Sequence, residues 1–125
     1  MRLDPLYHWS PKRNRASILQ HGLQVLSPEQ TRALPFCAGY LCFSMWPSCA
    51  WGLSAAMRED GEDEEWDCWQ VWLADTDEVR VMPLHGARVQ EVRVHNSIPP
   101  DRLWWVGERT YYTHETLPPP KRRRR

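Results

Sequence analysis

The sequence lacks the cysteine spacing of a metal site. None of the four (Cys37, Cys42, Cys49 and Cys68) belongs to a CxxC pair, and the five histidines do not complete a zinc set. We therefore expect no metal site. Because no signal peptide is recognisable either, buried free thiols in a reducing cytoplasm are expected. A disulfide among Cys37, Cys42 and Cys49 is the alternative, since these three lie close in sequence.

Long apolar runs are also absent. No stretch approaches the roughly 18 apolar residues that a membrane-spanning helix needs, so no membrane association is expected. No segment repeats, and 125 residues are enough for one domain with one core. The expected organisation is a single domain over residues 1–116, followed by a proline-rich, basic and disordered tail over residues 117–125.

The chain has no net charge, but its charges are unevenly distributed. Lys and Arg together number 16, as do Asp and Glu. Residues 121–125 (KRRRR) hold five of the positive charges, which leaves 11 basic against 16 acidic residues elsewhere, a formal charge of −5. A body of that sign is poorly suited to bind nucleic acid over a broad face. The tail is the first candidate for contact with nucleic acid, by neutralising phosphates, and a local basic stripe of Lys12, Arg13 and Arg15 is the alternative.

Tryptophan, by contrast, is abundant, with eight copies in 125 residues. The large indole ring fills apolar cores well, so a tryptophan-rich core is the expected explanation. A surface that stacks against a ring-bearing ligand is the alternative.

The first part of the chain predicts two strand–helix units. Residues 4–9 are expected to form a strand, Ser10 to cap the helix that follows, and Gly22 to end that helix. Residues 40–44 are aromatic and apolar and predict a second strand. A second helix is expected over residues 48–57, with a proline just before it.

The second half of the chain predicts mainly strands. Alternate side chains of a strand point to opposite faces, and over residues 66–74 both sets are largely apolar. This pattern is typical of a central strand. Further strands are expected at residues 79–82, 89–94 and 103–106, and residues 107–113 are expected to form a last strand or an extension. This order predicts an α+β domain in which two N-terminal helices pack on a mixed or antiparallel split sheet.

His8 and Ser10 are the first candidates for a binding site. They stand two positions apart in a predicted strand, so their side chains point to the same face. Both side chains donate and accept hydrogen bonds, and together they suit a vicinal diol such as a ribose. Asn14, one turn into the predicted helix, can add an amide. A helix cap at Ser10 and a half-buried, hydrogen-bonded histidine are the ordinary alternatives.

The string YHWSPKRNRASILQHGL, residues 7–23, resembles the opening of ADP-ribosyltransferase-fold proteins. It is most similar to the DNA-modifying toxins of the DarT type. In that family a histidine and a threonine or serine of the first strand hold the ribose and amide of NAD, and an asparagine contacts the cofactor. The resemblance therefore implies that His8, Ser10 and Asn14 bind NAD.

A second segment, EVRVHNSIPPDRL (residues 91–103), resembles the stretch that carries the catalytic glutamate of the same family. The resemblance implies that Glu91 is this glutamate. Its role would be to bind the 2′-hydroxyl of the nicotinamide ribose and to stabilise an oxocarbenium-like centre as nicotinamide leaves. It can also take a proton from the acceptor. By itself, Glu91 would be explained as a surface residue that begins an edge strand.

A third segment, GYLCFSMWPSCAWGL (residues 39–53), resembles the aromatic and serine-containing strand and helix of this fold. It implies that Tyr40 or Phe43 stacks on nicotinamide and that Ser44 supports the site; core packing is the alternative for both aromatic residues. Arg32 is the only candidate for the arginine that DarT-type enzymes place upstream of the second strand.

The expected function is NAD-dependent mono-ADP-ribosylation of a macromolecular acceptor, either protein or nucleic acid, by a toxin, an effector or a phage-borne modifier of host machinery. One alternative is an inactive transferase-fold module that binds or inhibits a partner, for which the acidic residues 59–65 are a reason. A further alternative is an RNA 2′-phosphotransferase. Those enzymes use an Arg-His-Arg-His set, whereas Leu6 and Tyr7 precede His8 here.

Overall fold

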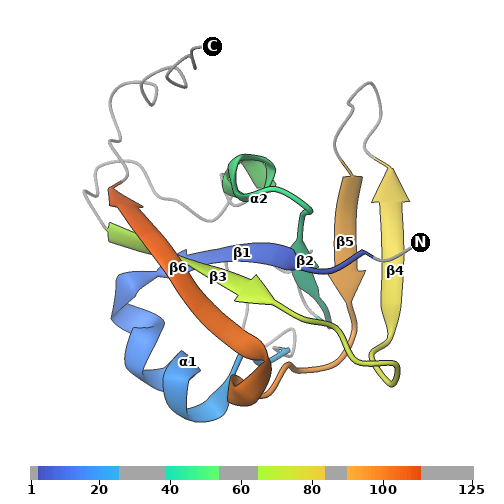
Figure 1. Ribbon diagram of the computed structural model, residues 1–125, viewed down its shortest axis with the longest axis horizontal. Coiled ribbons are helices and arrows are strands. Elements are labelled where there is room, and N and C mark those ends of the chain that lie inside the picture. The colour runs from blue at the N-terminus through green and yellow to red at the C-terminus, as the bar shows by residue number, and fades with distance from the viewer. Residues whose placement is uncertain (1–2, 26–38, 54–64, 84–89, 111–125) are drawn as a thin grey trace.

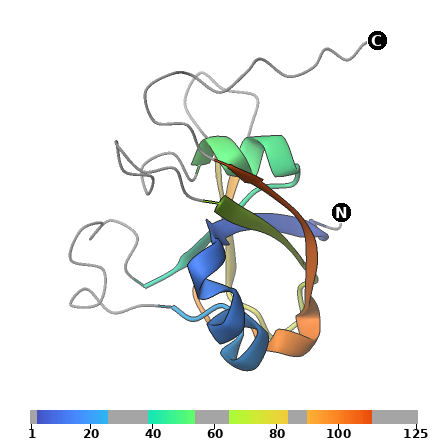
Figure 2. The same ribbon diagram turned by 90° about the vertical axis from the view of Figure 1, so that its left-hand side faces the viewer.

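The computed structural model describes residues 3–25, 39–53, 65–83 and 90–110. In these residues, strands form two three-stranded antiparallel sheets (Figures 1 and 2). The two predicted helices are α1 (Arg15–His21) and α2 (Pro47–Leu53). The first sheet has the order β1 (Leu6–Pro11), β3 (Glu65–Val71), β6 (Leu103–Thr110), and the second has the order β2 (Leu41–Phe43), β5 (Gln90–Val94), β4 (Val79–Pro83). The predicted α+β class is thereby confirmed, and the pairing is antiparallel.

The two sheets are joined at a backbone bridge between Tyr7 of β1 and Ser44, the residue after β2. The Tyr7 N–H donates to the Ser44 carbonyl oxygen at 2.8 Å, and the Ser44 N–H donates back at 3.2 Å. Through this bridge β1 and β2 lie side by side, although they belong to different sheets.

Apolar side chains pack on both faces of the first sheet. One cluster fills the space between the two sheets and α1, and it contains Leu6, Trp69, Val71, Phe43, Val92, Val94, Ile18, Leu23 and Ile98. The other lies against α2 and contains Trp9, Ala50, Trp51, Trp66 and Cys68. In both views α1 and α2 lie on opposite sides of β1 (Figures 1 and 2).

The tryptophans are divided between the core and the surface. Four of them, Trp9, Trp51, Trp66 and Trp69, are buried, as expected for a tryptophan-rich core. The other four, Trp46, Trp72, Trp104 and Trp105, are exposed. Core packing therefore explains only half of the unusual tryptophan content.

The predicted cap at Ser10 is wrong. The strand β1 continues through Ser10 and Pro11, because both residues pair with β3. A 3-10 turn follows at Lys12–Asn14, and α1 begins only at Arg15, with no side-chain cap. Pro11 is tolerated at the end of β1 because β1 lies at the edge of its sheet, where a missing N–H costs little. The end of the helix is confirmed, since Gly22 follows it with a φ of 80°.

Strand β3 is central, as predicted, and it lies between β1 and β6. Residues 107–110 extend the strand predicted at residues 103–106, so that one strand, β6, runs up to residue 110. Trp105 pairs with Trp69 and Gly107 pairs with Cys68, which leaves Val106 as the extra residue of a bulge. The glycine thus marks a bulge rather than a break between strands.

The remaining boundaries differ little from the predictions. Strands β4 and β5 occupy the predicted segments, with Pro83 included at the end of β4. Cys42, Cys49 and Cys68 are free thiols, so no disulfide joins Cys42 to Cys49. In the described ranges, no helix is both long and apolar enough to cross a membrane. The predicted tail at residues 117–125, Arg32 and Cys37 lie outside the described residues.

Candidate functional site

The three segments that carry the predicted site residues are neighbours in the fold. Strand β1 meets β2 at the bridge between Tyr7 and Ser44, and β2 pairs with β5. The pairing aligns Cys42 with Arg93 and Phe43 with Val92. When the register between β2 and β5 is extended by one residue, Ser44 lies opposite Glu91.

Glu91 lies in the middle strand of the second sheet and is 8% exposed. Its Oε2 atom accepts a hydrogen bond from the Cys42 thiol at 2.8 Å. Arg93 Nη2 donates to Oε1 at 3.3 Å, and Arg93 Nε lies 3.3 Å from Oε2. The explanation of Glu91 as a surface residue on an edge strand is therefore wrong, because this carboxylate is buried between a thiol and a guanidinium.

The residues around Glu91 include Tyr40 and Ser44, which share its side of the second sheet by strand alternation. The Arg93 guanidinium lies 4.4 Å from the centre of the Tyr40 ring, and its hydrogen bond to Glu91 outweighs burial and raises its pKa. The Ser44 side chain is fully buried, and its hydroxyl has no hydrogen-bond partner in the described structure. An unpaired buried hydroxyl is uncommon, but Ser44 has no exposed surface through which a ligand could reach it in this structure.

His8 bonds to the backbone of β2. Its Nδ1 atom lies 2.8 Å from the Cys42 carbonyl oxygen, which can only accept a hydrogen bond. Nδ1 must therefore carry the proton, and Nε2 is left as an acceptor. Burial lowers the pKa of His8 below 6.5 and the hydrogen bond to Cys42 only partly offsets this, so the ring is neutral at pH 7.

His8 and Glu91 contact opposite sides of β2. The His8 ring lies 5.3 Å from the ring of Phe43, whereas Glu91 contacts the side chain of Cys42. Phe43 and Cys42 are consecutive in a strand, so their side chains point to opposite faces. Phe43 is fully buried in the apolar cluster. Of the two aromatic candidates, Tyr40 is thus the one on the Glu91 side.

Ser10 and Asn14 lie together at the far end of β1. Asn14 Nδ2 donates to Ser10 Oγ at 3.4 Å, and Ser10 is 6% exposed, whereas Asn14 is exposed. Ser10 is paired across the sheet with Asp67 of β3. Because these side chains share one face, the Ser10–Asn14 pair adjoins a cluster of charged residues.

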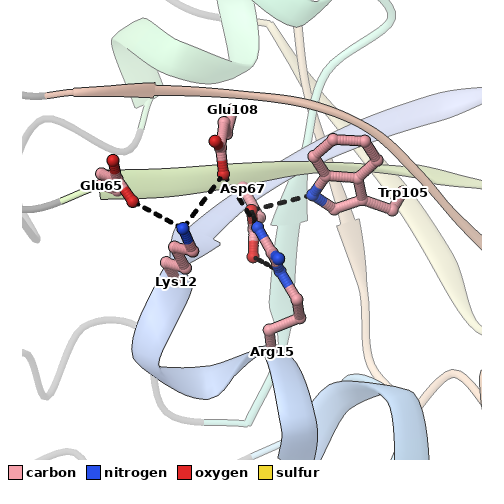
Figure 3. Close-up of polar contacts among 6 residues, drawn as sticks. All are labelled: Lys12, Arg15, Glu65, Asp67, Trp105 and Glu108. Carbon is pink, nitrogen blue, oxygen red and sulfur yellow. Dashed lines mark hydrogen bonds and ion pairs between the residues drawn. The ribbon is translucent and has the colours of Figure 1, made fainter.

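The centre of this cluster is Asp67, which is fully buried (Figure 3). Arg15 donates from Nε to Oδ2 at 2.9 Å and from Nη2 to Oδ1 at 2.6 Å, and Trp105 Nε1 donates to Oδ1 at 2.8 Å. Burial by itself would raise the pKa of Asp67, but the hydrogen bonds from Arg15 and Trp105 outweigh it and lower the pKa. Asp67 is therefore a buried, ionised and hydrogen-bonded carboxylate.

Three further charged residues, Lys12, Glu65 and Glu108, lie around the ion pair of Arg15 and Asp67. Glu108 of β6 accepts from Arg15 at 2.8 Å and lies 3.7 Å from the Lys12 ammonium, which also contacts Glu65 at 2.7 Å (Figure 3). The cluster thus ties the turn before α1 to β3 and β6. Sequence reasoning missed it, although a carboxylate inside the apolar strand EWDCWQV was a usable signal, because a buried charge needs a partner.

The described ranges contain no group of three metal-ligating side chains. No family model, no curated protein and no solved structure matches this chain.

Proposed function

We propose that this chain is an NAD-dependent mono-ADP-ribosyltransferase that modifies a macromolecular acceptor, either protein or nucleic acid. The observation that carries the proposal is the adjacency of β1, β2 and β5. These strands hold the three segments that resemble the family, and the segments are far apart in sequence.

The side chains next to Glu91 fit a nicotinamide ribose. The carboxylate accepts hydrogen bonds, and the Ser44 hydroxyl can donate or accept one. The Tyr40 ring already contacts the Arg93 guanidinium and the His95 ring, so nicotinamide would have to stack beside these contacts. The Cys42 thiol now occupies one carboxylate oxygen. Because a thiol is a weak donor, a ribose hydroxyl can replace it at small cost.

In the proposed reaction, bound NAD supplies the ADP-ribosyl group, and nicotinamide is the leaving group. Glu91 would accept a hydrogen bond from the 2′-hydroxyl, so that its negative charge lies near the carbon where positive charge develops. The same carboxylate can accept the proton of the attacking acceptor group. His8 would act indirectly, by anchoring β2 through the hydrogen bond from Nδ1 to the Cys42 carbonyl.

The test is transfer of label from NAD to a lysate that contains both protein and nucleic-acid acceptors. Glu91→Gln keeps the size of the side chain and is expected to lower labelling by about 10²–10⁴-fold. Glu108→Gln, a glutamate of β6 outside this face, is the matched control and should label normally. Protease and nuclease digestion of the labelled product then identifies the class of acceptor.

Two results would contradict the proposal. Labelling that survives Glu91→Gln in a folded protein removes Glu91 from the reaction. A wild-type chain that neither labels a lysate nor releases heat with NAD in calorimetry is not an ADP-ribosyltransferase.

A transferase-fold module without activity, which binds or inhibits a partner, is the second candidate. It is favoured by the contacts that Glu91 already makes with Cys42 and Arg93 and by the complete burial of Ser44. Such a module is expected to show no heat with NAD and the same partner binding with and without Glu91. The calorimetric titration therefore separates the two candidates.

A further inference from the structure

Arg93 is the cation that contacts Glu91. Its Nη2 atom donates to Oε1 at 3.3 Å and its Nε atom lies 3.3 Å from Oε2, so each carboxylate oxygen has a guanidinium nitrogen beside it. The two residues stand two positions apart in β5, and their side chains therefore share one face. Glu91 is 8% exposed, and a carboxylate removed from water stays charged only when it is paired. The charge of Glu91 thus depends on Arg93.

The guanidinium of Arg93 is itself held by its neighbours. It lies 4.4 Å from the centre of the Tyr40 ring, and the centres of the Tyr40 and His95 rings are 5.7 Å apart. The Arg93 side chain is 29% exposed, so the contact with Tyr40 is partly shielded from water, which strengthens a cation–π interaction. Tyr40 therefore supports Arg93 in the same way that Arg93 supports Glu91.

The two groups that contact Glu91 differ in what a bound ribose does to them. The Cys42 thiol lies on Oε2, the oxygen at which a ribose hydroxyl replaces it in the proposed function. Arg93 Nη2 bonds the other oxygen, so its hydrogen bond can remain. Arg93 Nε is buried beside Oε2 and makes no hydrogen bond in the described structure. The guanidinium is thus the contact that can hold the carboxylate while ribose is bound.

The neighbouring strand β4 adds a second arginine to this face. In the strand pairing, Arg80 lies opposite Arg93, and Met82 lies opposite Glu91. Arg80 is exposed, and no ion pair joins it to Glu91 in the part of the chain that is described. The two arginines therefore share a residue type and a face of the sheet, but only Arg93 contacts the carboxylate.

We propose that Arg93 is the positioning residue of Glu91, which keeps the carboxylate ionised and directed at the nicotinamide ribose, and that Tyr40 holds its guanidinium. The inference rests on the proposed function, in which Glu91 stabilises an oxocarbenium-like centre. Arg93 acts through Glu91 and does not touch NAD. Its loss should therefore slow the release of nicotinamide far more than it weakens the binding of NAD.

The test is the release of nicotinamide from NAD in the presence of the lysate, measured as kcat and KM over a range of pH. Above the acid limb of the profile, Arg93→Gln is expected to lower kcat about 10–100-fold and to change KM by less than about threefold. The acid limb should move up by about one pH unit or more, because the carboxylate loses a nearby positive charge. Arg80→Gln, the matched control, removes the same charge one strand away and should leave both values close to those of the wild type.

Arg93→Lys separates the charge from the geometry. Lysine keeps the positive charge, but a single ammonium replaces the guanidinium fork that serves both carboxylate oxygens. The acid limb is therefore expected near its wild-type position, whereas kcat should stay below the wild-type value. If Arg93→Gln is not folded by circular dichroism, this pair of results from Arg93→Lys carries the test.

Three results would overturn this inference alone, in a wild type that labels the lysate and a Glu91→Gln variant that does not. They are a folded Arg93→Gln with the wild-type kcat and acid limb, a rise in KM at unchanged kcat, which would mean that Arg93 binds NAD directly, and an Arg80→Gln that is impaired as much as Arg93→Gln. A wild type that neither labels the lysate nor releases heat with NAD overturns the proposed function, and this inference with it.

Discussion

At the scale of single residues, Asp67 shows how a buried charge is kept in an otherwise apolar strand. Two hydrogen bonds from Arg15 and one from Trp105 replace the water that burial removes. Arg15 is one-third exposed, so the pair is only partly screened by solvent. These contacts make the position of α1 against β3 depend on one carboxylate.

Asp67→Asn is expected to lower the free energy of unfolding by about 2–4 kcal/mol, because the charge-assisted hydrogen bonds to a buried group are lost and Arg15 loses its partner. Glu108→Gln, at the exposed rim of the same cluster, should cost no more than about 1 kcal/mol. Urea unfolding followed by tryptophan fluorescence measures both. Equal losses would mean that the buried pair is not the main contributor.

His8 illustrates a different use of one side chain. Beyond the bridge between Tyr7 and Ser44, the carbonyl of Cys42 is bonded by an imidazole instead of a backbone N–H of β1. This hydrogen bond connects β1 to β2 where the backbone hydrogen bonds between them end. It also fixes the tautomer of His8, with the proton on Nδ1. The sequence pattern identified His8 as a candidate, but this partner follows only from the pairing of distant strands.

At the scale of elements, the end of α1 depends on Gly22. Its φ of 80° lies in the region that favours glycine. A Cβ at this position would also meet the carbonyl oxygen of Ile98, and the next residue, Leu23, forms a backbone bridge with Ile98 at 2.9 and 2.8 Å. The helix end is thus attached to the segment before β6.

Gly22→Ala is therefore expected to destabilise the protein more than Gly39→Ala. Both glycines have a positive φ, 80° and 89°, but a Cβ at Gly39 would have nothing within 4 Å. The strain alone should cost about 1–2 kcal/mol at Gly39, whereas Gly22→Ala must also displace the Leu23–Ile98 bridge. Thermal unfolding of the two variants tests this. Similar losses at both positions would show that the close contact is unimportant.

The elements themselves were largely predictable. The two helices, the central position of β3 and the segments of β4 and β5 follow from local periodicity and from Gly and Pro. One prediction failed for a non-local reason: Ser10 belongs to β1 because β3 pairs with it. Of the two alternatives for residues 107–113, the extension is the one found up to residue 110, and a bulge accommodates Gly107 inside β6.

At the scale of the whole molecule, stability depends on pH through Asp67, whose lowered pKa is described above, and through Asp77 and His8. Burial by itself would raise the pKa of Asp77, but hydrogen bonds from Arg102, the Ala74 backbone and Asn96 lower it from 3.8 to about 2. Burial lowers the pKa of His8 from 6.5. In all three cases the unfolded chain binds a proton more readily than the folded chain, so acid favours unfolding.

Stability is therefore expected to fall in two steps as the pH decreases. The contribution of His8 is complete above pH 6.5 and is lost below it. The contribution of Asp77, about 2 kcal/mol, is complete above pH 3.8 and is lost as the pH approaches 2. The measurement is the free energy of unfolding in urea as a function of pH.

Substitutions of His8 and Asp77 identify which residue causes each of the two losses of stability. His8→Asn keeps an N–H donor for the Cys42 carbonyl and should remove the first step, whereas His21→Asn, at the exposed end of α1, should leave it unchanged. Asp77→Asn should reduce the second step, and the lowered pKa of Asp67 should maintain the remainder. A first step that persists in His8→Asn would place its origin in another group.

The sequence by itself determined the α+β class, the positions of most helices and strands, the end of α1 at Gly22 and the acidic character of the chain outside its last residues. These properties depend on neighbours within a few positions along the chain. Only the tertiary structure decided which residues meet, such as Arg15 with Asp67, His8 with Cys42, and Cys42 with Glu91. Such contacts depend on the register between strands that are distant in sequence. A shift of one residue moves every side chain of a strand to the other face.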